Sequence, residues 1–322
     1  MRVTVTGGLG YIGACVVEEL TDGGHDVRVL DSLLHGQEDV AAHVTRLGAE
    51  IVRGDVRDAD ACAGAFAGAD AVVHLAAIVG DPACAKDPAV SNDVNVGGSR
   101  NVVARAQDAG VRRLIFASTC SNYGRMADPT VPITEDGELA PVSLYAEQKV
   151  QIEQALLGGG FGELEPTCLR FATVYGVAPR MRFDLTVNEF TRDLWADRAL
   201  EVFGEQFWRP YVHVRDAARG VVLVLGSDPD KVAGRVFNVG HSDENYRKLD
   251  LVKLITGQLG RGEVTYVQRS EDPRDYKVGF ERIASELGFV PAQRVPDGIR
   301  EIIATLEVEG FGDPYADRFR NS

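Results

Sequence analysis

The chain has 322 residues, 45% of them hydrophobic, and a formal net charge of −14, which predicts a globular protein with one large domain or a domain with a second lobe. The acidic balance does not supply the basic surface that a nucleic acid or an anionic membrane attracts, so we expect neither partner. We also expect no membrane span and no signal peptide, because apolar runs stay well below about 20 residues and the chain starts directly with a strand pattern.

Strand and helix patterns alternate through residues 1–176. Apolar, β-branched runs separated by helices are typical of buried parallel strands, so we predict an α/β fold, a Rossmann doubly wound parallel sheet. Helices are expected at 11–24, 91–110 and 143–159, where glycines follow or end the pattern. The expected strands are RVTVT, DVRVLD, EIVRGD, AVVHLAA, RRLIFAST and PTCLRFATVYG.

The pattern changes after about residue 176. Residues 208–240 contain strand and helix patterns that suggest a return to the first domain. We therefore predict a Rossmann domain of residues 1–176 plus about 208–240. Residues 177–207 and 241–322 are predicted to form a smaller, mixed α/β C-terminal substrate lobe.

A glycine-rich segment, TGGLGYIG, joins the first expected strand to the first expected helix. Gly7, Gly10 and Gly13 allow a tight turn and a close approach to a pyrophosphate. The helix start at Tyr11 and Ile12 offers free N–H groups to that anion. An ordinary glycine turn is the alternative, but the position between strand and helix favours dinucleotide binding.

Asp31 ends the second expected strand, eighteen residues beyond the last glycine of that turn. An acid there binds the adenosine ribose and repels a 2′-phosphate. It favours NAD over NADP, since no arginine follows directly and strand alternation points Arg28 elsewhere. Ser32, Asp55 and Val56 are further candidates for the adenosine end. A surface aspartate that opens a turn is the alternative for Asp31.

Tyr145 and Lys149 lie four residues apart in SLYAEQK, on one face of an expected helix. A phenol with its usual pKa of about 10 is a poor base at neutral pH. A nearby ammonium and an oxidised nicotinamide would stabilise the phenolate, which could then take a proton from a substrate hydroxyl. A solvated helix pair is the alternative.

Five segments in this order, TGGLGYIG, GDV, HLAA, ASTCSNYG and YAEQK, resemble the extended short-chain dehydrogenase/reductases. Within them the chain resembles the NAD-dependent nucleotide-sugar epimerase/dehydratase family, including the UDP-glucose 4-epimerases. LRFATVYG, FGEQFWRPYVHVRDAA, FNVG and RSEDPRDY extend the resemblance over nearly the whole chain. It implies a Rossmann domain holding NAD, a C-terminal lobe holding a nucleotide diphosphate sugar, and a homodimer formed through residues 90–109 and 143–157.

The resemblance also implies roles for single residues. Tyr145 matches the catalytic base and Lys149 its partner, which also holds the nicotinamide ribose, while Thr119 matches the hydroxyl that binds the reacting sugar. Arg209 matches an arginine that clamps the diphosphate, and Phe203 a residue at the nucleotide base. The implied lining of the cofactor cleft is Leu75, Ala76 and Ala77. The other implied substrate residues are Cys120, Ser121, Asn122, Thr173, Asp184, Arg269 and Arg274.

The residues directly after Thr119 bear on the reaction. Dehydratases resemble STDEVYG, whose acidic pair moves protons during loss of water, and decarboxylases resemble STSEVYG. Cys120 and Ser121 stand at these places here, which disfavours elimination. We predict a 4-epimerase that oxidises the sugar at C4 and reduces the 4-ketone again on its opposite face.

Three alternatives remain at this point. A dehydratase could use the Cys120 thiol as a weak acid, although a small buried residue at a strand end is the simpler interpretation. A 4-ketoreductase is a second alternative. A non-catalytic NAD-sensing regulator is the third, but such proteins commonly lose the tyrosine or the lysine.

Several departures from the family pattern cluster around the substrate. Thr173 and Asp184 replace residues that are often asparagine, and Asn122 is unusual before the following tyrosine. They suggest a substrate other than the UDP-galactose/UDP-glucose pair. Arg180 and Arg182 are candidates for contacting an unusual substituent, with a solvated loop as the alternative.

The five cysteines are odd in number and widely spaced, without a C-x-x-C pair. This usage predicts a reduced, cytoplasmic chain. The six histidines show no metal-ligand spacing, so we predict no metal site.

Overall fold

The computed structural model describes residues 1–126, 128–129, 131–267 and 274–321. Its centre is a seven-stranded sheet in the order β10-β6-β5-β4-β1-β2-β3, in which every neighbouring pair is parallel. These strands are β1 (Arg2–Thr6), β2 (Asp26–Asp31), β3 (Glu50–Arg53), β4 (Ala71–His74), β5 (Arg113–Thr119), β6 (Glu165–Phe171) and β10 (Arg235–Val239).

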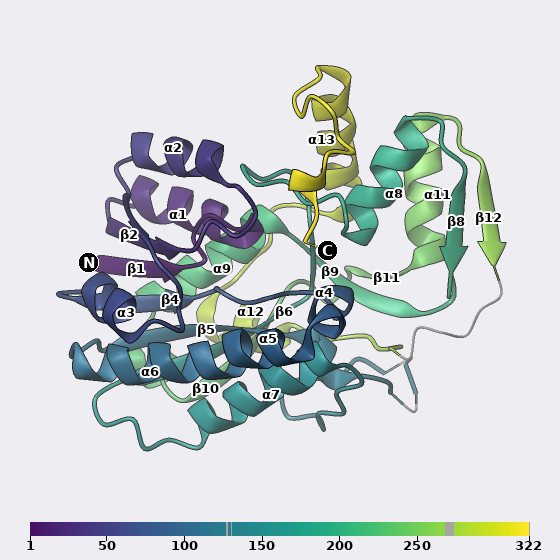
Figure 1. Ribbon diagram of the computed structural model, residues 1–322. Helices are drawn as coiled ribbons and strands as arrows, with labels where there is room; N and C mark the ends of the chain where they lie inside the picture. Colours follow the sequence, from purple (N-terminus) through teal and green to yellow (C-terminus); the bar gives the residue numbers. More distant parts are fainter. Residues whose placement is uncertain (127, 130, 268–273, 322) are drawn as a thin grey trace.

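Helices cover both faces of this sheet. Figure 1 shows α1 and α2 above it and α6 and α7 below it, while α9 packs against α1 and α3 packs against α6. The helices that accompany the sheet are α1 (Tyr11–Asp22), α2 (Glu38–Arg46), α3 (Ala59–Phe66), α4 (Asp81–Lys86), α5 (Pro88–Asn92), α6 (Ser99–Asp108), α7 (Leu144–Leu157), α9 (Val214–Gly226), α10 (Pro229–Val232) and α12 (Glu281–Leu287). Because both faces are covered, β1 and β4 are apolar runs with nearly every residue buried. The predicted Rossmann fold is confirmed.

The helix expected at 91–110 is longer and less regular than predicted. Residues 88–108 form α5, a π-helical segment from Asp93 to Gly98, and α6 in direct succession. π-Helical turns are rare and occur frequently at functional sites, and this one faces the end of β4 through Asn95, whose side chain bonds both the N–H and the C=O of Ile78.

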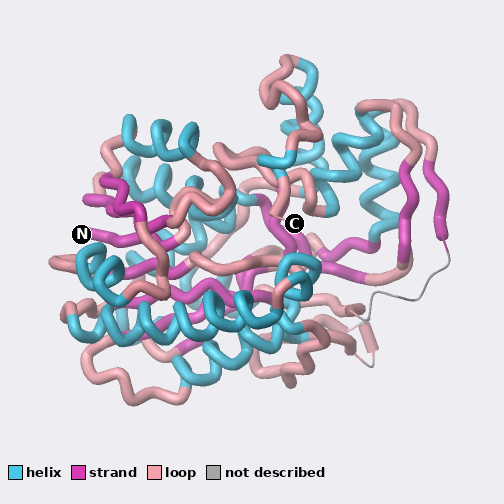
Figure 2. Tube along the Cα trace, viewed as in Figure 1, coloured by secondary structure: helices cyan, strands magenta, loops and turns pink. Residues whose placement is uncertain are grey.

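A smaller group of elements lies at the right of the sheet in Figures 1 and 2. It contains a three-stranded sheet in the order β11-β9-β7 and a two-stranded sheet of β12 and β8. Its strands are β7 (Thr173–Tyr175), β8 (Leu200–Phe203), β9 (Trp208–His213), β11 (Asn245–Arg247) and β12 (Val264–Val267), and its helices are α8 (Thr186–Trp195), α11 (Lys248–Leu259) and α13 (Val295–Glu307).

Strands that follow one another in the sequence belong to different sheets. In the predicted return at 208–240, β10 pairs with β6 in the large sheet, whereas β9 pairs with β7 and β11 in the small one. The chain thus enters the small part at 172, returns to the large part near 213, and leaves it again after β10, with α12 as a later return.

All five cysteines are described, buried and free of disulfide bonds. Within the described residues, helices are too short or too polar to cross a lipid bilayer.

Candidate active site

The glycine-rich turn connects β1 to α1 and lies against the segment after β4. A Cβ on Gly7, whose φ is +70°, would be 2.7 Å from the backbone nitrogen of Ala76. A Cβ on Gly13 would overlap the carbonyl oxygen of Gly7. Gly10 is the N-cap of α1 and has no side chain to bond the first N–H groups. The turn therefore presents backbone donors and a helix dipole, an arrangement that fits a pyrophosphate.

Asp31, the last residue of β2, is hydrogen-bonded to the glycine-rich turn. Its carboxylate accepts hydrogen bonds from the N–H of Leu9 (3.0 Å) and of Leu33 (2.9 Å), and burial raises its pKa. Ser32 is exposed beside it. The acid is thus held at the edge of the turn, as binding of an adenosine ribose requires.

The predicted cofactor residues after β3 and β4 differ in their exposure and in their contacts. Asp55 pairs with Arg57 at 2.8 Å, which lowers the pKa of Asp55, while the Val56 side chain is buried. The segment after β4 lies beside the glycine turn, because the N–H of Leu75 donates to the carbonyl of Thr6 at 3.1 Å. In that segment, Leu75, Ala76 and Ala77 are all half-buried.

Thr119, Tyr145 and Lys149 come from β5 and α7, which pack together. The Lys149 ammonium donates to the carbonyl of Ala117 at 2.8 Å and lies 5.9 Å from the centre of the Tyr145 ring. Thr119 Oγ1 accepts a hydrogen bond from the N–H of Ser121 and keeps its own proton to donate. The structure therefore fixes the lysine against the strand that carries the threonine.

Burial dominates the electrostatics of this group. It raises the pKa of Tyr145, which the charge of Arg182 acts to lower. It also lowers the pKa of Lys149 to about 8. The pKa of the phenol is thus raised by burial in this structure, whereas from the sequence we expected Lys149 to lower it.

Two predicted substrate residues face the interior instead. Cys120 is 1% exposed and its thiol lies 3.3 Å from the carbonyl of Arg170. Asn122 is fully buried and donates to Ser118 Oγ at 3.0 Å. Both belong to a 3₁₀ turn over Cys120–Tyr123, and their contacts with Arg170 and Ser118 hold these two side chains in the interior. Contact of these two side chains with substrate stays a prediction, and Ser121 between them is half-buried.

A buried ion pair behind the site was not anticipated. Glu153 of α7 and Arg170 of β6 are 2.5 Å apart, with side chains 0% and 4% exposed. Glu153 also accepts a hydrogen bond from Ser118, the residue before Thr119, at 2.5 Å. Its position four residues after Lys149, on the same helix face, was the one sequence signal available.

The predicted diphosphate residues are neighbours in the structure. Arg209 of β9 donates to the carbonyl of Arg274 at 2.6 Å, and the Arg274 guanidinium pairs with Asp81 of α4 at 3.0 Å. Arg269 lies outside the described residues. Phe203 ends β8 with 39% of its surface exposed.

The other two substrate candidates lie along the chain after β6. Thr173 begins β7 and is half-buried. The Asp184 carboxylate forms two bonds with Arg182, at 3.0 and 2.8 Å, which lower its pKa against the effect of burial. Asp184 is therefore already engaged with a cation.

Comparisons with known proteins identify the family of this chain. Residues 3–240 match the model of the NAD dependent epimerase/dehydratase family, and a UDP-glucose 4-epimerase of Corynebacterium glutamicum is 30% identical over 90% of this chain and 91% of its own length. The chain belongs to this epimerase/dehydratase family. The family is NAD-dependent, and the glycine turn and Asp31 fit the adenosine diphosphate half of NAD, which is its cofactor.

Solved structures of relatives cover nearly the whole chain. The dTDP-glucose 4,6-dehydratase DesIV of Streptomyces venezuelae, solved with NAD, superposes with a TM-score of 0.86 at 29% identity, covering 98% of this chain and 99% of its own. A UDP-glucose 4-epimerase of Thermotoga maritima, solved with UDP-glucose, superposes with a TM-score of 0.84 at 26% identity, covering 96% and 99%. Members of the family with different reactions therefore share this fold.

Proposed function

We propose that the protein is an NAD-dependent nucleotide-sugar 4-epimerase. The observation that carries the proposal is the placement of Cys120, whose thiol is buried and lies against the carbonyl of Arg170. Burial also raises the pKa of that thiol well above its usual value, so it is a poor proton donor. The positions where dehydratases carry an acidic pair thus contribute no proton-transfer group.

Tyr145 acts as the base that removes the proton of the sugar C4 hydroxyl. Thr119 donates a hydrogen bond to the same oxygen, and the Lys149 ammonium stabilises the phenolate that forms. Bound NAD supplies reversible hydride acceptance at C4. If the 4-keto sugar rotates in the site and presents its opposite face before it is reduced, the C4 configuration is inverted. No cofactor is consumed overall.

The nucleotide diphosphate of the substrate is assigned to the small group of elements. Arg209 and Arg274 lie side by side and can each bond phosphate oxygens in a fork geometry. Phe203 offers an exposed ring for the base. Thr173, Ser121 and Asp184 are the proposed sugar and phosphate contacts beside them.

The quaternary structure and location are part of the proposal. We expect a cytoplasmic homodimer that pairs α6 and α7 of two copies, as the family resemblance implies. The exposed residues of α7 lie on one helix face: Glu147, Gln151, Gln154 and Ala155.

A 4,6-dehydratase is the second candidate, supported by the likeness to DesIV. It would need an acid from another element, and Asp81 is close enough to raise the pKa of Tyr145. Asp81 is paired with Arg274, which favours a structural role for its carboxylate over proton transfer.

The test incubates the enzyme with UDP-, dTDP-, GDP-, CDP- and ADP-sugars and follows the C4 configuration by NMR. Epimer formation without added NADH supports the proposal. A 4-keto-6-deoxy product would show a dehydratase, and consumption of NADH by a 4-keto substrate would show a ketoreductase. Tyr145→Phe should abolish turnover while the protein retains NAD; full activity in that variant would overturn the catalytic assignment.

A further inference from the structure

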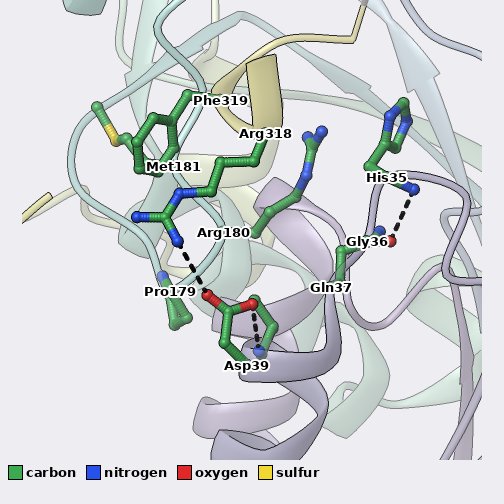
Figure 3. Close-up of a pocket in the computed structure, with 10 residues that line it drawn as sticks. His35, Gly36, Gln37, Asp39, Pro179, Arg180, Met181, Arg318 and Phe319 are labelled. Carbon is green, nitrogen blue, oxygen red and sulfur yellow. Dashed lines mark hydrogen bonds and ion pairs between the residues drawn. The ribbon is translucent and has the colours of Figure 1, made fainter. Parts of the chain in front are cut away.

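A pocket lies beside the adenosine end of the cofactor site. It is bordered by the connection from β2 to α2, by the segment after β7, and by a short 3₁₀ helix at Asp317–Phe319. Figure 3 shows Arg180 in this pocket, between His35 on one side and Arg318 and Phe319 on the other. Asp31, the predicted ribose acid, lies four residues before His35 in the same connection.

The segment that carries Arg180 is attached to the glycine-rich turn. The Tyr11 hydroxyl, from the first residue of α1, donates to the carbonyl of Gly176 at 2.6 Å. Asn188 of α8 donates to that hydroxyl at 3.1 Å and bonds the N–H of Gly176 at 3.0 Å. Arg180 therefore belongs to a segment that is held against the proposed pyrophosphate site.

The Arg180 side chain is fixed but incompletely bonded. It is 5% exposed, and one guanidinium nitrogen donates to the carbonyl of Arg320 at 3.1 Å. Its Nε is buried and has no hydrogen-bond partner within the described chain. A buried charged donor without an acceptor is costly, so an acceptor from a ligand would stabilise it.

The charge of this pocket comes from arginines. Burial and the neighbouring Arg182 lower the pKa of Arg180 to about 10, which leaves it protonated at neutral pH. The pKa of His35 is lowered to about 4 by burial and by Arg180, so His35 is neutral. Arg318 is half-exposed and pairs with Asp39 at 3.9 Å. Arg180 is thus the buried cation of the pocket.

We propose that Arg180 binds a phosphate of the dinucleotide cofactor, as a positively charged counterpart to Asp31 supplied from the segment after β7. A buried, preorganised guanidinium bonds phosphate oxygens strongly and with fixed geometry. The role concerns cofactor binding and is independent of the reaction that follows.

The test measures dissociation constants of the full-length protein by calorimetry. Arg180→Met should weaken binding of NAD and of ADP-ribose at least about tenfold, as loss of a charged hydrogen bond does. Adenosine, which has no phosphate, should lose less than about twofold. Arg180→Lys, which keeps the charge, should recover part of the loss.

One further ligand, UDP, and two further variants separate the alternatives. Arg318→Met removes the other cation of the pocket and should change these constants little; an equal loss would contradict the assignment to Arg180. Three results for Arg180→Met would each overturn the proposal. These are an equal loss of affinity for adenosine and for ADP-ribose, unchanged dissociation constants, and a loss of affinity for UDP alone. If Arg180→Met lowers the thermal midpoint, Arg180→Gln, which still bonds the Arg320 carbonyl, is compared instead with the same criteria.

Discussion

Lys149 is a buried cation, and no carboxylate of the described residues forms an ion pair with it. It is 5% exposed, donates to the carbonyl of Ala117, and lies over the Phe116 ring at 4.8 Å. Burial lowers its pKa from 10.5 to about 8. Burial of the charged ammonium therefore lowers the stability of the folded state, although the proposed mechanism requires that charge.

This cost predicts a pH-dependent stability difference between wild type and Lys149→Met. Below pH 8 the lysine is protonated in both the folded and the unfolded state, so the folded state is destabilised by the full free energy of burying the charge. Between pH 8 and 10.5 the folded protein loses the proton first, so the free energy of unfolding of the wild type should rise relative to the variant by up to about 3 kcal/mol. Urea unfolding at pH 7 to 10.5 measures it, and a difference that does not change with pH would contradict the assigned burial.

Individual residues also show where sequence interpretation stops. Tyr145, Lys149 and Thr119 were identified because their spacing and surrounding motifs are local. Cys120 and Asn122 were assigned to the substrate from their place in the same motif, but both side chains are buried in the turn after β5. Which face a residue takes in an irregular turn depends on the partners it meets, such as Ser118 and Arg170.

At the scale of elements, the Glu153–Arg170 pair joins α7 to β6 behind the catalytic residues. Arg170→Met would leave the Glu153 charge buried without its partner and should reduce the free energy of unfolding by about 3–5 kcal/mol. The double variant Glu153→Leu/Arg170→Met should recover most of that loss, because no uncompensated charge remains. Denaturant unfolding measures both.

An exposed ion pair provides the control for this experiment. Arg261 and Asp197 are 2.7 Å apart, with half or more of each side chain exposed, so Arg261→Met should leave stability nearly unchanged. A loss after Arg261→Met as large as that after Arg170→Met would show that burial of the pair is not the cause.

The glycine turn between β1 and α1 predicts a second effect at this scale. Gly13→Ala should weaken NAD binding by more than about tenfold, because its Cβ overlaps the Gly7 carbonyl and displaces the N–H groups that meet the pyrophosphate. Gly64→Ala, in α3 where a Cβ meets no atom within 4 Å, should leave NAD binding intact and add up to about 1 kcal/mol of stability. NAD titration and thermal unfolding measure both variants; equal NAD affinities would exclude this role for the turn.

At the scale of the whole molecule, the proposed dimer makes α7 an interface. Gln151 lies at the centre of its exposed face, so Gln151→Arg would place two like charges near the dimer axis and should shift the protein toward monomer. Sedimentation equilibrium at about 10 μM, a concentration typical for moderate affinities, measures the mass. Lys231→Arg, on the distant α10, is the control, and a monomeric wild type would contradict the proposal.

The sequence by itself determined the Rossmann fold, the cofactor turn with Asp31, and the Tyr145–Lys149 pair. Each is encoded within one strand–helix unit, where periodicity and short spacing decide the geometry. Tertiary structure alone decided that Glu153 meets Arg170 and that Arg180 approaches the cofactor side from a segment almost 150 residues beyond Asp31. Burial and electrostatic pairing between distant segments depend on how the elements pack, and no local pattern records that packing.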